Sequence, residues 1–93
     1  MATIQTALER LRNFVTDVKT IPEFGHVGWQ EREGVLYVCT LLVRRDQDAH
    51  LQVSHKVVKW LKQHGDVEVE FRTLSQPRFT LQDLEQAGYH LIS

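Results

Sequence analysis

The sequence predicts an α+β domain in which helices cover one face of a small sheet. Apolar residues recur every three or four positions from 4 to 19, which is typical of an amphipathic helix, whereas residues 67–73 alternate with period two. From Val35 to Val43 both parities are apolar, so this strand must be covered on both faces. A chain of 93 residues has few elements to spare, so the second cover has to come from a partner chain or from its own C-terminal segment.

The first helix is expected from Ile4 to Lys19, since Pro22 disfavours helical backbone in the residue before it. Residues 24–30 predict a strand weakened by two glycines, at an edge or half-exposed. The polar turn 31–34, which ends in Gly34, then joins this strand to the central strand as a hairpin. The hairpin therefore places the doubly apolar strand inside the sheet.

A second helix is expected to begin at Asp46 or Asp48, either of which suits an N-cap, and to end at His64 before Gly65. In the following strand, 67–73, apolar residues alternate with Glu68, Glu70 and Arg72, which predicts one buried face and one wet face. We interpret residues 1–93 as a single domain with residues 74–93 as a C-terminal extension. The extension holds a short helix at about 81–87 and an extended segment, 89–92, that adds an edge strand or reaches across a dimer.

Composition excludes several classes of function. Eleven basic residues against twelve acidic ones give a net charge of -1, so the field that usually drives nucleic-acid binding is missing. The single cysteine, Cys39, excludes an internal disulfide and lies in the apolar run, where an inert buried thiol is expected. No apolar stretch is long enough to span a membrane and no signal sequence is recognised, which predicts a cytoplasmic protein without a membrane role.

No motif for catalysis or for a cofactor is found, and no metal ligand is assigned. The histidines are the only reservoir of metal ligands, and the candidates are His50, His55 and His64. His50 and His55 are five residues apart, which turns them about 140° from each other on a helix. An alternative hypothesis is therefore a metal-responsive domain, with zinc as the ion, in which His55 acts with a second histidine or with an aspartate at 46 or 48.

A third hypothesis is an enzyme with a cleft between two protomers. Glu68 and Glu70 share one face of a strand, roughly 7 Å apart, a separation at which paired carboxylates can carry out acid–base chemistry. Arg72 and His26 complete the set considered for this hypothesis. The commoner interpretation of such alternation is a solvated strand face.

Three passages resemble the αββαβ, ferredoxin-like cytoplasmic domain of cation diffusion facilitator transporters. These passages are VKTIPEFGHVGWQEREGVLYVCTLLV, DAHLQVSHKVVKWL and VEVEF, and the likeness covers about three quarters of the chain. The second passage has Ser54-His55 where the family usually has Ala-His, and the last strand has no histidine where the family has its ligand motif. The resemblance therefore implies an open-faced ferredoxin-like sandwich and a dimer, and His55 alone does not complete the family's zinc site.

The leading hypothesis is a homodimeric binding or regulatory module that acts on an unknown protein or small molecule. The residues expected at its interface are Tyr37, Cys39, Leu41, Val43 and Trp60. The opposite parity of the central strand, with Leu36, Val38, Thr40 and Leu42, is equally open as the covered face. Whether the C-terminal segment exchanges between chains also stays open.

Overall fold

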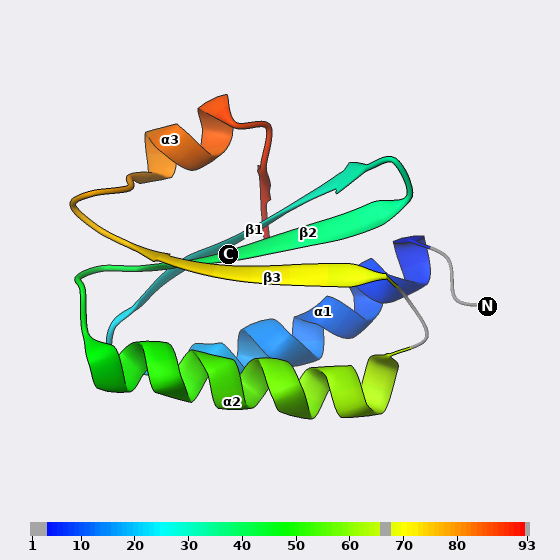
Figure 1. Ribbon diagram of the computed structural model, residues 1–93, viewed down its shortest axis with the longest axis horizontal. Coiled ribbons are helices and arrows are strands. Elements are labelled where there is room, and N and C mark those ends of the chain that lie inside the picture. Colours follow the sequence, from blue (N-terminus) through cyan, green and yellow to red (C-terminus); the bar gives the residue numbers. More distant parts are fainter. Residues whose placement is uncertain (1–3, 66–67, 93) are drawn as a thin grey trace.

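The computed structural model describes residues 4–65 and 68–92, which form three layers (Figure 1). The elements in chain order are α1 (Ile4–Val18), β1 (Phe24–Arg32), β2 (Val35–Leu42), α2 (Gln47–His64), β3 (Val69–Ser75), α3 (Leu81–Gln86) and β4 (His90–Leu91). The sheet has the order β3-β2-β1-β4. Strand β1 is antiparallel to β2 and to β4, whereas β2 is parallel to β3. The predicted α+β class, the short C-terminal helix and the extra edge strand are confirmed.

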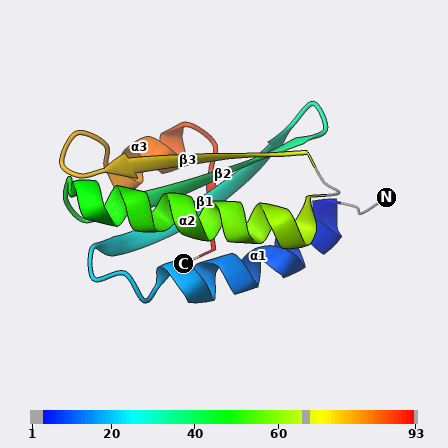
Figure 2. The same cartoon turned by 60° about the horizontal axis from the view of Figure 1, so that its bottom comes forward.

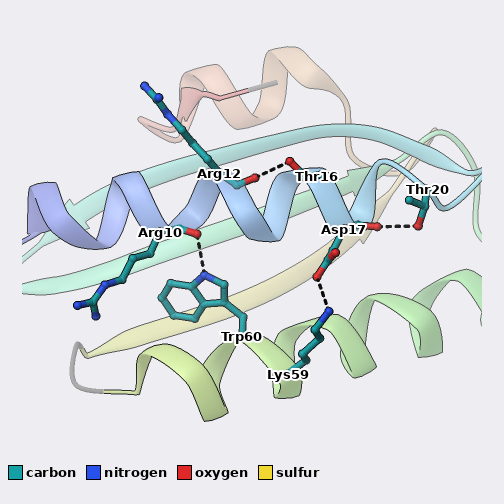
Figure 3. Close-up of polar contacts among 7 residues, drawn as sticks. All are labelled: Arg10, Arg12, Thr16, Asp17, Thr20, Lys59 and Trp60. Atoms are coloured by element: carbon teal, nitrogen blue, oxygen red, sulfur yellow. Dashed lines mark hydrogen bonds and ion pairs between the residues drawn. The ribbon is translucent and has the colours of Figure 1, made fainter.

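Helices α1 and α2 lie side by side under one face of the sheet (Figure 2). Leu11, Phe14 and Val18 of α1 are buried against the sheet, as is Val53 of α2. Trp60 is buried where the two helices meet, and its Nε1 donates a hydrogen bond of 3.1 Å to the Arg10 carbonyl oxygen (Figure 3). Most of the core therefore lies on this face, where burial of apolar surface is the main stabilising term.

The polar contacts in Figure 3 join α1 to α2 at a second point. Lys59 Nζ lies 3.3 Å from Asp17 Oδ2, so this flank of α2 faces α1. Thr16 and Thr20 donate from their hydroxyls to carbonyls of α1 and stay within the first helix and its end. The α1–α2 pair is thus held mainly by the buried ring of Trp60, since an exposed ion pair contributes about 0 to 1 kcal/mol.

Helix α3 covers the opposite face of β2. Its Leu84 is 2% exposed and packs with the buried side chains of Cys39 and Leu41. Thr80 caps the helix because its hydroxyl oxygen accepts a hydrogen bond from the Asp83 amide, and the Thr80 amide in turn donates to the Asp83 carboxylate. The chain's own C-terminal segment is therefore the second cover that the doubly apolar strand requires.

Two predicted boundaries are wrong. Strand β1 continues to Arg32, because its pairing with β2 runs without a break to Val35 opposite Arg32. Leu74 and Ser75, expected in the C-terminal extension, belong to β3, because Ser75 still pairs with Leu42 and Leu74 packs under α3. The predicted start of this strand at residue 67 lies outside the described residues. Within residues 4–65 and 68–92, none of the helices combines the length and apolarity needed to cross a membrane.

Candidate functional site

A polar hollow of about 500 Å³ lies on the part of the sheet face that α3 leaves uncovered. Such a volume falls within the range of small-molecule sites. The side of the hollow next to α3 comes from the segment that follows this helix, and the floor comes from three neighbouring strands. Its lining residues are Gln30, Arg32, Tyr37, Glu70, Phe71, Arg72, Ala87 and Tyr89.

The register of the strands places the residues of the hollow's floor next to one another. Tyr37 of β2 pairs with Gln30 of β1 and with Glu70 of β3, which makes one row across the sheet. In the next row Cys39 pairs with Gly28 and with Arg72. Since alternate residues of a strand point to one face, both rows direct their side chains away from α1 and α2.

Glycines allow the segment after α3 to approach the sheet closely. A Cβ atom on Gly28 would lie 3.1 Å from Tyr89 Cβ, so the missing side chain makes room for this tyrosine. Gly88 has φ of +94°, which favours glycine, and a Cβ there would lie 3.2 Å from Gln30 Oε1. Tyr89 N in turn donates to the Leu84 carbonyl over 3.0 Å. These contacts fix the side of the hollow.

The hollow is rich in hydrogen-bonding groups. Arg32, Arg72 and Glu70 are exposed, whereas Tyr37 and Tyr89 are half-buried. Guanidinium groups bind carboxylates and phosphates through paired donors, and a carboxylate such as that of Glu70 accepts from amino or hydroxyl groups. The arrangement therefore suits a small molecule that has both an anionic group and a donor.

Cys39 is buried beneath the hollow. Burial raises the pKa of its thiol from 9.0 to about 11, and the positive charge of Arg72 opposes that rise. The thiol is consequently protonated at neutral pH, and because the thiolate is the reactive form, Cys39 is a poor nucleophile. It packs as a small apolar side chain.

The structure separates the residues expected at the dimer interface. Cys39 and Leu41 are buried under α3, and Trp60 is buried between α1 and α2, all within one chain. A second copy therefore reaches Cys39 or Leu41 only by displacing α3. Tyr37 is half-buried in the hollow, and Val43, just past the end of β2, is 49% exposed.

The histidines do not converge. His50 lies in a separate hollow near the start of α2, together with Arg45 and Arg78. His55 is exposed on the outer side of α2, and the His64 ring contacts Trp60 with centroids 5.0 Å apart. Across residues 4–65 and 68–92, no group of three or more His, Cys, Asp or Glu side chains is placed to hold a metal ion.

The residues of the enzyme hypothesis are only partly brought together. Glu70 and Arg72 line the hollow, and Glu68 is not among its lining residues. His26 pairs with Leu41, which is four residues along β2 from Tyr37, or about 13 Å. His26, in β1, therefore lies toward the opposite end of the sheet from Glu70, in β3.

Sequence reasoning did not assign Gln30, Arg32 or Tyr89 to a site. The signal that could have found Tyr89 is Gly28, a strand residue whose missing side chain leaves space for a close approach. Gly88 is a second signal, because it follows a short helix and allows the sharp return to the sheet.

Comparison with other proteins gives no further assignment. No protein-family model matches the chain, and neither a curated protein nor a solved structure matches it at a significant level.

Proposed function

We propose that the protein is a homodimeric binding module without catalysis of its own, whose hollow takes a small molecule with an anionic group and a hydrogen-bond donor. The observation that carries this proposal is the convergence of Arg32, Arg72, Glu70 and two tyrosines in one hollow beside α3. Concave sites with a few placed polar groups are the usual form of small-molecule sites.

The charges in the hollow argue for a ligand of mixed character. Arg32 and Arg72 supply paired donors for a carboxylate or phosphate, while Glu70 disfavours a ligand with negative charge alone. Tyr37 and Tyr89 add apolar ring surface and a hydroxyl each. A small molecule such as an amino acid, with separated charges of both signs, fits this set best.

The wider features of the proposal follow from the fold. The order of elements from α1 to β3 is that of the αββαβ unit, which supports the ferredoxin-like interpretation and the resemblance to the dimeric transporter domain. Fold alone is weak evidence for activity, so the ligand is argued from the hollow. We place the module in the cytoplasm, which accords with a lone buried thiol.

Calorimetric titration with a panel of α-amino acids, dicarboxylates and sugar phosphates tests the ligand class. We expect the amino acids to bind best, and Arg32→Gln to raise the Kd of the best binder by about tenfold or more, since a charged hydrogen bond is lost. Arg12→Gln, at an exposed position of α1, is the matched control and should leave the Kd unchanged.

Two results would overturn the proposal for the hollow. One is that no member of the panel binds with a Kd below the millimolar range. The other is that Arg32→Gln and Arg12→Gln bind equally well. Both results concern the ligand, and neither depends on how two copies of the chain meet.

A further inference from the structure

Strand β3 is an edge of the sheet, and its outer backbone groups have a definite parity. The Leu36 amide donates to the Glu68 carbonyl and the Gln76 amide donates to the Leu42 carbonyl, both over 3.0 Å. Since backbone direction alternates along a strand, the even-numbered residues of β3 bond to β2. Val69, Phe71 and Thr73 therefore direct their backbone N–H and C=O groups outward from the sheet, where a further strand can pair.

The side chains of β3 are self-complementary in one antiparallel register. If Phe71 faces its own copy across a twofold axis, Val69 faces Thr73 and Glu70 faces Arg72, so two pairs of opposite charge form. A shift that centres the axis on Glu70 places Glu70 opposite its own copy while Glu68 faces Arg72, and a shift that centres it on Arg72 places the two arginines opposite each other. Because Phe71 directs its backbone groups outward, Phe71 with its copy and Val69 with Thr73 become the hydrogen-bonded pairs of this register.

The flank of α2 beside β3 carries an exposed apolar residue, Leu61, close to the level of Phe71 along the sheet edge. Figures 1 and 2 place α2 along the β3 edge, with α1 on the other side of α2. Leu61 is two residues from Lys59, about 200° around the helix from the side chain that contacts α1. Leu61 is 37% exposed. Trp60, in the same turn, contacts the Phe71 ring with centroids 5.5 Å apart.

We propose that a second copy of this chain pairs with β3 edge to edge, antiparallel and centred on Phe71. Glu70 then faces Arg72 of the partner subunit, and Leu61 approaches the same flank of the partner's α2. Because Glu70 and Arg72 also line the hollow, the partner subunit's Arg72 lies at the rim of each hollow. This inference rests on the proposed homodimer and does not depend on the ligand.

We call the proposed contact between the two β3 strands the seam. Charge reversal tests the seam in the absence of any ligand. Glu70→Arg places two positive charges opposite each other in both pairs, and Arg72→Glu places two negative charges opposite each other. We expect each single variant to raise the dimer Kd by about 100-fold, measured by sedimentation at micromolar concentrations. The double variant Glu70→Arg/Arg72→Glu should dimerise like the original chain, because opposite charges again face each other.

Mixing the two single variants gives the sharpest outcome. A Glu70→Arg chain against an Arg72→Glu chain restores both pairs, so we expect a heterodimer from two samples that are each monomeric. Glu31→Arg, an equally exposed reversal on β1 away from the seam, is the matched control and should stay dimeric. Circular dichroism of each variant shows whether the chain is folded.

Three results would each overturn the inference. The first is that the original chain is monomeric throughout the micromolar range. The second is that Glu70→Arg forms as much dimer as Glu31→Arg. The third is that the mixed single variants remain monomers. A dimer that is indifferent to Glu70 and Arg72 would still support the proposed homodimer and would place its interface elsewhere. Failure of the ligand titration alone would leave the seam unaffected.

Discussion

The Cys39 side chain is buried inside the protomer, within an apolar cluster that includes Leu41 and Leu84. The apolar run predicted a buried, inert thiol, and the structure buries it and raises its pKa. The same parity also suggested contact with a second copy, and in the structure Leu84 of α3 in the same chain belongs to the cluster that covers Cys39. Local sequence gives the polarity of an environment, whereas the identity of the neighbour depends on contacts far apart in the chain.

The pKa of Cys39 predicts a fall in stability at high pH. The folded-state pKa, about 11, lies above the ordinary value of 9.0, so folding favours the protonated thiol. This contribution is fully present below about pH 9 and is lost as the pH rises through 11; it amounts to at most roughly 2 to 3 kcal/mol. Urea unfolding of the original chain and of Cys39→Ala across this range measures it. The original chain should lose more stability than the variant, and parallel curves would contradict the prediction.

Helix α3 covers one part of the sheet face opposite α1 and α2 and leaves the other part open. It has only six residues, so its stability comes from docking through Leu84 and from the Thr80–Asp83 capping box rather than from helix propensity. Because α3 stops short of the full face, it leaves the hollow open, and the segment that follows α3 supplies one side of the hollow. The length of this helix therefore sets the size of the site.

Leu84→Ala should loosen α3 and expose Cys39. Loss of a buried leucine side chain costs about 2 to 5 kcal/mol, and Leu84 is 2% exposed. We expect lower stability in thermal unfolding and faster reaction of Cys39 with a thiol reagent under native conditions. Leu91→Ala removes the same atoms from a 41% exposed position and should change both quantities much less. Equal thiol reactivity in the two variants would show that α3 does not protect Cys39.

The helices and strands were predictable because their signals are local. Spacings of three and four predicted α1, cap residues predicted the ends of α2, and the alternation of Glu68, Glu70 and Arg72 predicted the exposed face of β3. The hollow was not predictable, because Gln30, Tyr37 and Glu70 meet only through strand register and Tyr89 arrives from the C-terminal segment. Likewise, both a partner chain and α3 satisfied the apolar pattern of β2, and only the three-dimensional packing decides between them.

At the scale of the whole molecule, the proposed assembly joins two sheets through exposed charges. Glu70 and Arg72 are both exposed, so their mutual attraction across the seam is subject to screening by salt. The apolar flank of α2 is not screened in this way. The two contributions can therefore be separated by ionic strength.

We expect the dimer Kd to rise several-fold between low salt and roughly 0.5 M salt, where the screening length falls to a few ångströms. The neutral variant Glu70→Gln/Arg72→Gln should bind more weakly at low salt and show little dependence on salt. Sedimentation over a salt series measures both chains. If the dimer Kd rises equally steeply with salt concentration for both chains, Glu70 and Arg72 do not face each other across the seam.

The brevity of β4 limits how far such an assembly can grow. At the far side of the sheet the short strand β4 pairs Leu91 with Gly28 and His90 with Trp29, and beyond them β1 carries the exposed charges of Glu31 and Arg32. A charged and interrupted border is a poor template for another strand. Since the β3 contact is isologous, it uses up the same surface on both copies. The proposed assembly is therefore expected to close at two subunits rather than to extend into fibres.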